Sequence, residues 1–370
     1  MAIDRRAGPI VEPPLVPWNR IAVAAASALI GLVCACSGSC HSQRTGKDGL
    51  TEPARLCRSG PTDACRSAAE VEKWLERSDI EILRSTPTPA GVQGARVLTL
   101  RLADEPHAVF RAKWRAHSTT TSRNSPRREL AAYAVQKLFL EPDEYVAPPT
   151  APHCFPLDEY RAAVDRKAKP TFPETRCVYG ILSYWLEDVQ PLGDAEKAGW
   201  FDGEHAHALD RALFEKNTGY RDSIATVNLF TYLIAHADSH ARNFLITRDR
   251  AAPFVYSVDN SLSLGLARNA NLPDRSDWSR IRVPALPRSR IERLRRIGDR
   301  VDRLRSVAEL ERKDRGLVVV EPSIDAPPSD GMDWKDSRLR VGLTADEIEG
   351  VRDRVARLLE RVDRGEIRVY

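Results

Sequence analysis

The sequence predicts a two-lobed α+β fold, with a small β-rich lobe at residues 71–186 and a larger, mainly helical lobe at residues 187–370. The first observation is the alternation of apolar and polar residues in short runs between residues 80 and 114, which is the period of a β-strand. The second is the recurrence of apolar residues at helical spacing from residue 206 onward. The third is composition, because 370 residues with 42% hydrophobic and 29% charged residues are typical of a soluble globular protein.

The N-terminal lobe is expected to begin with a short helix and a β-meander. Residues 71–75 fit a helix, and the strands of the meander are expected at 80–83, 96–101 and 108–114. Between the first two strands lies a segment rich in proline, threonine and glycine, which predicts a turn.

A longer helix follows the meander. Ser125 is a typical N-cap residue and Pro126 is favoured at the first helical position, so the helix is expected to run from there to about residue 140. Residues 151–176 are rich in proline and charge and are expected to form an exposed loop. The continuously apolar run 178–186 predicts a buried strand that connects the lobes.

The C-terminal lobe is expected to be mainly helical. Thr344 and Glu347 have the spacing of a capping box, which marks the start of the last helix. Helices are expected at residues 206–214, 223–234, 291–307 and 344–358, and two short strands at 244–247 and 254–258.

The first 35 residues predict an export signal. Arginines precede an apolar run at 21–35, which is short for a membrane span and typical of a signal-peptide core. Leu-Val-Cys-Ala before Cys36 resembles the lipobox of bacterial lipoproteins, and the resemblance implies that Cys36 is lipidated and anchors the protein to a membrane. An ordinary signal peptide and an uncleaved anchor are the alternatives. Residues 36–70 lack apolar periodicity and are expected to be a flexible tether.

The cysteines beyond this segment favour disulfides. Cys57 and Cys65 are eight residues apart in a polar segment, and Cys154 and Cys177 flank the predicted loop. Neither pair has the Cys-x-x-Cys spacing of a zinc site, so disulfides in an oxidising compartment fit best, with Cys40 left over. Unpaired thiols in a cytoplasmic protein are the alternative.

The charge of the chain gives no indication of a nucleic-acid partner. The formal net charge is only +4, and the basic residues are interleaved with acidic ones. We therefore interpret them as solvated faces and expect no nucleic-acid binding.

Three residues after the helix at 223–234 have the chemistry of a metal-dependent site. Asp238 and Asn243 lie five positions apart between a predicted helix and a predicted strand, and Asp259 ends the next strand. Phosphoryl transfer uses one carboxylate to orient or deprotonate a hydroxyl, and an amide oxygen and a second carboxylate to hold Mg²⁺. Asp238 and Asn243 would otherwise only stabilise turns.

Upstream residues could supply the phosphate-binding part of such a site. Lys113 ends a strand and Glu129 lies in the first turn of the next helix, so the pair could form the ion pair that holds nucleotide phosphates. Arg111 lies on the same face as Lys113 and could take its place. Gly91 and Gly94 lie in the turn between the first two strands, where backbone N–H groups could approach phosphates. The alternative for Lys113 and Glu129 is exposed surface charge.

The stretch Asp238-Ser-His-Ala-Arg-Asn243 resembles the Asp-x-His-x-x-Asn catalytic loop shared by phosphatidylinositol 3- and 4-kinases, HipA-type kinases and the secretory-pathway casein kinases. The order of the upstream elements is similar as well, in scattered segments over residues 80–265. The resemblance implies a two-lobed protein-kinase-like fold that uses ATP and Mg²⁺. It also implies Asp238 as the catalytic aspartate, Asn243 and Asp259 as metal ligands, and a nucleotide-contacting hinge after 178–186. The strand lysine and the residues after Asp259 depart from the family pattern.

These observations predict an atypical kinase-like phosphotransferase that acts on an unidentified hydroxyl acceptor and is exported as a membrane-anchored bacterial lipoprotein. The alternatives are a pseudokinase that binds a nucleotide or partner without turnover, a metal-dependent hydrolase using His236, Asp238 and His240, and a structural lipoprotein. A cytoplasmic location is the alternative to export.

Overall fold

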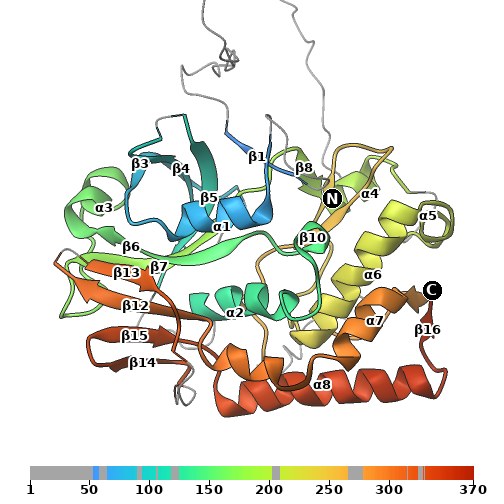
Figure 1. The fold of residues 1–370 in the computed structure, drawn as a ribbon. Helices are drawn as coiled ribbons and strands as arrows, with labels where there is room; N and C mark the ends of the chain where they lie inside the picture. The colour runs from blue at the N-terminus through green and yellow to red at the C-terminus, as the bar shows by residue number, and fades with distance from the viewer. Residues whose placement is uncertain are drawn as a thin grey trace, which may run out of the picture. The chain divides into compact units, whose positions relative to one another are not determined.

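The computed structural model describes residues 53–57, 65–89, 94–105, 107–117, 125–201, 209–265, 278–314, 316–323, 328 and 330–370 (Figure 1). They form a mixed α/β structure. The predicted signal segment 1–35, Cys36, Gly91 and most of the predicted tether lie outside the described residues. Within the described ranges, no helix has both the length and the apolar character needed to cross a membrane.

A five-stranded antiparallel sheet forms the first half of this structure. Its strand order is β3-β4-β5-β7-β6, and it contains the predicted meander. The strands are β3 (Ile80–Pro87), β4 (Arg96–Leu102), β5 (Val109–Ala116), β6 (Thr150–Pro156) and β7 (Cys177–Tyr184). The helices of this half are α1 (Ala68–Glu76), α2 (Pro126–Gln136) and α3 (Leu157–Ala163), with a 3₁₀ turn at Pro142–Glu144.

The second half contains most of the remaining helices. They are α4 (Leu192–Lys197), α5 (Arg211–Lys216), α6 (Thr218–Leu233), α7 (Arg288–Arg295) and α8 (Ala345–Asp363). Small sheets join β8 (Val189–Pro191), β9 (Phe244–Thr247) and β10 (Val255–Ser257), and pair β11 (Ala285–Leu286) with β16 (Arg368–Val369). Near the N-terminus, β1 (Arg55–Leu56) pairs with β2 (Cys65–Arg66). The predicted capping box of α8, with Thr344 as N-cap and Glu347 three residues on, is present.

The segment 151–176 is only in part the exposed loop that its composition predicts. Residues 151–163 form the buried edge strand β6 and the helix α3, whereas residues 164–176 contain no helix or strand and are mostly exposed or half-buried. Pro152 lacks a backbone N–H, and an edge strand tolerates this because it pairs on one side only. The Cys154–Cys177 disulfide joins this strand to β7 with Cα atoms 5.5 Å apart. The second predicted disulfide, Cys57–Cys65, is also present.

The C-terminal third differs from the sequence prediction in two ways. The helix expected at 291–307 ends as α7 at Arg295, and a 3₁₀ helix follows at Gly298–Arg305. Gly298 has a φ of +45°, which interrupts the helical backbone at this point. Residues 308–341 then form a four-stranded antiparallel sheet that the sequence analysis missed. Its strands are β12 (Ala308–Lys313), β13 (Gly316–Val320), β14 (Met332–Lys335) and β15 (Arg338–Val341).

This late sheet packs on the first sheet. Leu310 and Leu339 belong to the same buried cluster as Tyr179 and Ile181 of β7. Residues assigned by sequence to the C-terminal lobe therefore cover part of the N-terminal sheet.

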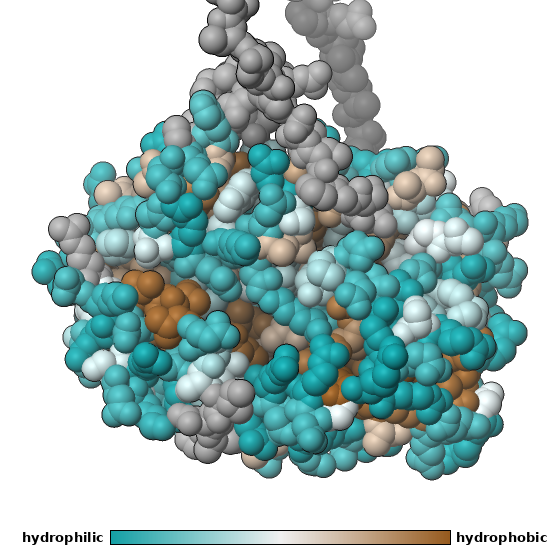
Figure 2. Space-filling view, viewed as in Figure 1, coloured by the Kyte–Doolittle hydropathy of each residue, from teal (hydrophilic) through white to brown (hydrophobic). Residues whose placement is uncertain are grey.

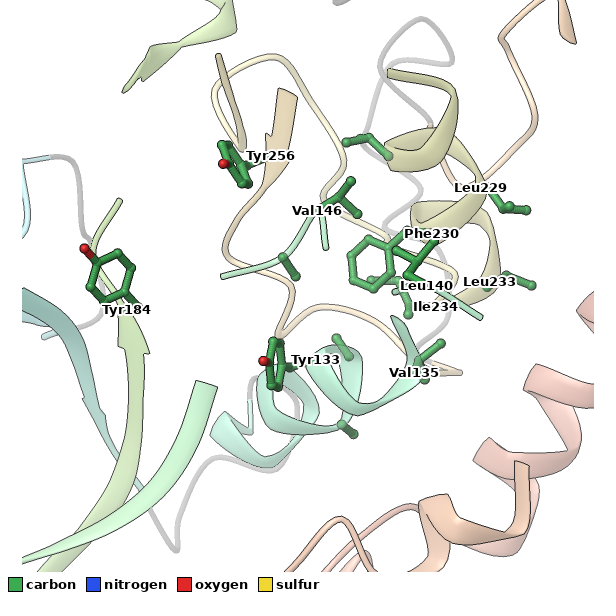
Figure 3. Close-up of a cluster of buried hydrophobic side chains, with 14 of the residues drawn as sticks. Tyr133, Val135, Leu140, Val146, Tyr184, Leu229, Phe230, Leu233, Ile234 and Tyr256 are labelled. Carbon is green, nitrogen blue, oxygen red and sulfur yellow. The ribbon is translucent and has the colours of Figure 1, made fainter. Parts of the chain in front are cut away.

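α6 is capped at its N-terminus and packed into the core at its C-terminal end. Asn217 caps it by accepting a hydrogen bond from the N–H of Tyr220 at 2.9 Å. Phe230 and Ile234, near its C-terminal end, are fully buried. Figure 3 shows them beside Leu140 and Val146, which follow α2 in the chain. The apolar packing therefore fixes the end of α6 against the segment after α2.

His153 provides a test of the packing between β6 and α1. Burial lowers the pKa of its imidazole to about 4, although a hydrogen bond with the backbone of Leu75 raises it. Because the pKa is lower in the folded state, the unfolded state takes up the proton first as the pH falls. Stability is therefore lost between the unfolded pKa of about 6.5 and the folded pKa. Between pH 7 and pH 5, the unfolding free energy of the wild type should fall by about 2 kcal/mol more than that of His153→Asn.

The measurement is urea unfolding at both pH values. His107 is exposed, so His107→Asn should reproduce the wild-type pH dependence. An equal loss in His153→Asn and the wild type would contradict the assignment.

Candidate functional site

Lys113 of β5 brings three elements together. Ala112 and Trp114 are buried on one face of the strand, and strand alternation places Lys113 on the other. The Nζ of Lys113 lies 2.9 Å from Oδ1 of Asp259 and 3.9 Å from Oε2 of Glu129. Only 18% of the lysine side chain is exposed, so solvent screens these contacts weakly.

Glu129 lies in the first turn of α2 and is almost completely buried, with 4% of its side chain exposed. Its Oε1 accepts a hydrogen bond from the backbone N–H of Asn260 at 3.2 Å. Asn260 directly follows Asp259. The helix and the lysine therefore contact the same turn after β10.

The three charged groups control one another's protonation. Burial raises the pKa of Glu129, and the charge of Lys113 offsets this only in part. Burial lowers the pKa of Lys113, but the charges of Glu129 and Asp259 outweigh it, so that the pKa is above its ordinary value. Burial raises the pKa of Asp259, but the charge and the hydrogen bond of Lys113 outweigh it, so that the pKa is below its ordinary value. At neutral pH the lysine and Asp259 are therefore both charged.

The N-terminal end of α2 is held by a second, separate ion pair. Arg127 donates hydrogen bonds to both carboxylate oxygens of Glu347 at 2.9 and 3.0 Å, and one to the carbonyl of Gly342 at 3.1 Å. Arg128 donates to the same carboxylate at 3.0 Å. Since Glu347 also caps α8, these contacts fix the turn that carries Glu129 to the last helix.

The loop after α6 positions Asp238 and Asn243. The chain leaves the helix through Ala235, which has a positive φ of +47°. The amide nitrogen of Asn243 donates to the backbone carbonyl of Asp238 at 2.9 Å and to its carboxylate at 3.1 Å. His240 also lies beside this carboxylate, with Nε2 3.4 Å from Oδ1. The two predicted residues are therefore in direct contact.

Asp259 joins this loop to Lys113. The backbone N–H of Val258 donates to the carbonyl of Asn243 at 2.9 Å, which places Asn243 beside the start of the Asp259 turn. Asp259 has a φ of +59°, a left-handed conformation that aspartate tolerates better than most residues. About half of its side chain is exposed, at 49%. One carboxylate thus contacts the buried lysine and still faces solvent.

Asn243 and Asp259 carry oxygen atoms of the kind that could bind a small divalent cation. Because the Asn243 nitrogen donates to Asp238, its amide oxygen is the atom left for a cation. Oδ1 of Asp259 accepts a hydrogen bond from Lys113, so the second carboxylate oxygen of Asp259 is the atom left for a cation. Amide and carboxylate oxygens are the ligands that Mg²⁺ prefers.

Two other predicted residues have different surroundings. Arg111 pairs with Glu187, its Nε donating to Oε1 at 2.7 Å, so it is occupied away from Glu129 and Asp259. Gly94 has a φ of +71° in the turn before β4, which suits glycine.

Sequence reasoning missed several contacts around the site. Arg115, two residues after Lys113 on β5, donates to the hydroxyl of Ser261 at 2.7 Å. The alternation of Arg111, Lys113 and Arg115 was the signal that could have placed it. Ser239 also went unnoticed. Its hydroxyl accepts a hydrogen bond from the N–H of Trp278 at 2.9 Å and ties the Asp238–Asn243 loop to the start of the next described segment.

The hydrolase alternative receives no geometric support. Among the residues that the structure describes, no group of three His, Cys, Asp or Glu side chains could hold a metal ion. The Nδ1 of His236 accepts a hydrogen bond from the N–H of Asp238 at 3.2 Å, and the imidazole is fully buried. Burial lowers the pKa of His236 to about 4, although the charge of Asp259 favours the protonated form. His236 is therefore a neutral, buried support of the loop.

Comparison with solved structures finds matches that cover most of the chain. A hydra Fam20 protein solved with sugar has a TM-score of 0.47 and 15% identity, covering 83% of this chain and 90% of its own. A Golgi casein kinase solved with Mn/ADP bound has a TM-score of 0.44 and 11% identity, covering 82% of this chain and 78% of its own. The sequence matches no protein-family model and no curated protein. Both TM-scores are below 0.5, so the case for a function depends on this chain's own residues.

The anchoring of α2 can be tested through Glu347. Its side chain and that of Arg127 are each 8% exposed. Removing one partner of a buried ion pair leaves an uncompensated charge, so Glu347→Gln should lower the unfolding free energy by about 3 kcal/mol. Glu349 on the same helix has a 63% exposed side chain, and Glu349→Gln should change it by less than about 0.5 kcal/mol.

Urea unfolding at pH 7 measures both variants. Equal stabilities of the two variants would show that the Arg127–Glu347 pair does not hold α2.

Proposed function

We propose that this protein is an atypical kinase-like phosphotransferase that uses ATP and Mg²⁺ to phosphorylate a hydroxyl acceptor. The observation that carries the proposal is the meeting of Lys113, Glu129 and Asp259 at one point, with Asn243 and Asp238 directly beside it. These five residues come from β5, α2 and two loops. Sequence order alone does not require them to be close in space.

Lys113 is the group proposed to bind nucleotide phosphates. A phosphate-binding cation must be fixed and must stay charged, and both conditions follow from its two carboxylate neighbours. Glu129 holds the lysine from α2. Because Asp259 contacts the lysine and faces solvent, phosphates bound at the lysine would lie next to the proposed metal ligands.

Asp238 is the group proposed to receive or orient the acceptor hydroxyl. Its carboxylate is fixed by the Asn243 amide and lies beside His240, and its side chain is 32% exposed, so an acceptor can reach it. Asn243 and Asp259 would hold Mg²⁺. The bound cation would neutralise the charge on the phosphoryl oxygens.

Mg²⁺-dependent nucleotide binding is the first test. The wild type should show a rise in melting temperature with ATP and Mg²⁺ that is absent with ATP alone. Asp259→Ala should abolish it, because the variant lacks a metal ligand. Asp249 lies in the exposed turn between β9 and β10, so Asp249→Ala is a matched control that should keep the shift. No shift in the wild type would contradict the kinase-like proposal.

Turnover distinguishes an enzyme from a pseudokinase-like protein. In the wild type, slow ATP hydrolysis should be measurable even without the acceptor, because water can replace a hydroxyl. Asp238→Ala should bind nucleotide as the wild type does but hydrolyse it at least about 100-fold more slowly. Binding without any hydrolysis in the wild type, and without transfer to any acceptor in a cell-envelope extract, would favour the pseudokinase alternative.

We further propose that the chain is exported and anchored by a lipid at Cys36. Two disulfides among the described residues support an oxidising compartment. Metabolic labelling with a fatty-acid analogue should mark the wild type in a bacterial host. Cys36→Ala should lose the label, whereas Cys40→Ala should keep it. Labelling of neither the wild type nor Cys40→Ala would contradict the anchor.

A further inference from the structure

A pocket of about 280 Å³ lies apart from the candidate site. Its walls come from α1, α2, β6, β12 and β13 and from the residues directly after β13. Figure 2 shows hydrophobic side chains around a hollow on the face that carries β13 and α2 in Figure 1. None of the residues that line this pocket belongs to the candidate site.

The inner wall of the pocket is apolar. Leu130 and Ala134 contribute from α2, Pro152 from β6 and Val319 from β13. β6 and β13 are the edge strands of two different sheets, and they pack together without pairing. Apolar side chains from both edges line the gap between them, which suits an aliphatic group.

The other wall carries an excess of negative charge. Glu72 and Glu76 of α1 and Glu321 after β13 line it, and among its described residues Lys137 at the end of α2 is the one cation. Lys137 already pairs with Glu72, whose second oxygen accepts a hydrogen bond from Tyr133 at 3.1 Å. The charge of Lys137 is therefore already matched by Glu72.

Glu76 and Glu321 are the two carboxylates left over. Neither has a hydrogen bond or ion pair with any residue in the described ranges of the chain. Glu76 is exposed at the edge of the pocket. Partial desolvation and the neighbouring charge of Glu72 raise its pKa, with Lys137 opposing the effect and Glu321 adding to it. A second positive charge near Glu76 would remove this repulsion.

We propose that this pocket binds an alkyl cation, that is, a guanidinium or ammonium group on an aliphatic stem. The stem would lie against Leu130, Ala134 and Val319, and the charged end would reach Glu76 and Glu321. The volume fits one arginine-sized group. The same chemistry is offered by a free small molecule and by a basic side chain of a peptide. Binding at this pocket does not depend on the proposed phosphotransferase activity.

Calorimetric titration of the whole protein tests the proposal with matched ligands. N-acetyl-arginine amide represents a basic peptide side chain, and agmatine represents a free small cation. N-acetyl-citrulline amide has the shape of the arginine compound without its charge. We expect at least one of the two cations to bind with a Kd below about 1 mM, as befits a ligand with few heavy atoms, and the citrulline compound to bind at least about tenfold more weakly than its arginine counterpart. The tighter of the two cations identifies the source. Failure of both cations to bind, or equal binding of the citrulline compound, would overturn the proposal.

Three variants locate the binding. Glu76→Gln should weaken the preferred cation by about tenfold, because it removes one of the two unpartnered charges. Ala134→Met should fill the apolar wall and abolish binding. Glu215 is an exposed carboxylate of α5, an element that contributes nothing to the pocket, so Glu215→Gln should bind as the wild type does. Unchanged binding in both Glu76→Gln and Ala134→Met would place the ligand elsewhere and contradict the assignment.

Discussion

The interaction on which the site depends is the pairing of one largely buried lysine with two carboxylates from distant parts of the chain. Lys113 lies on β5, Glu129 on α2 and Asp259 after β10. A buried charge without a partner costs several kcal/mol, so the sheet, the helix and the turn are stable only when all three meet. Since Glu129 also accepts a hydrogen bond from Asn260, the same turn is fixed twice. The geometry proposed to bind phosphates is thus also the geometry that satisfies the buried charges.

This pairing requires α2 to be held in place, and contacts at both ends of the helix hold it. At the start, Arg127 bonds to Glu347 of α8. At the end, the fully buried Gln136 accepts hydrogen bonds from the backbone N–H groups of Val146 and Ala147 at 3.0 and 2.9 Å. Because neither anchor involves the lysine, they would hold the helix even when the charges of the site are rearranged by a bound ligand. The last helix, far away in sequence, therefore contributes to the position of Glu129.

Several contacts among the candidate residues agree with the sequence prediction more closely than the strands around them do. Asp238 and Asn243 could be placed because their residue types and spacing carry chemical information that is local in the chain. The ion pair of Arg111 with Glu187 could not be predicted, because the two residues are 76 positions apart and only the folded sheet brings them together. β6 was missed because Pro152 is typical of a loop unless the strand is known to lie at the edge of a sheet. The sheet at 308–341 was missed because its charged residues pair across strands, as Arg338 does with Glu309, and obscure the apolar alternation.

The same sheet links the fold to the compartment. Cys177 is fully buried and forms the disulfide with Cys154 in the cluster where β13 packs. A Cβ atom at Gly316 of β13 would lie 3.1 Å from the Cys177 sulfur, so glycine lets the strand approach the disulfide closely. The packing of the two sheets is therefore built around an oxidised pair, which favours folding in an oxidising compartment. If the proposed phosphotransferase acts in such a compartment, a nucleotide must be available there as the phosphoryl donor. This requirement concerns the compartment and not the geometry around Lys113. Export and phosphoryl transfer are thus separate proposals, and evidence against one leaves the other intact.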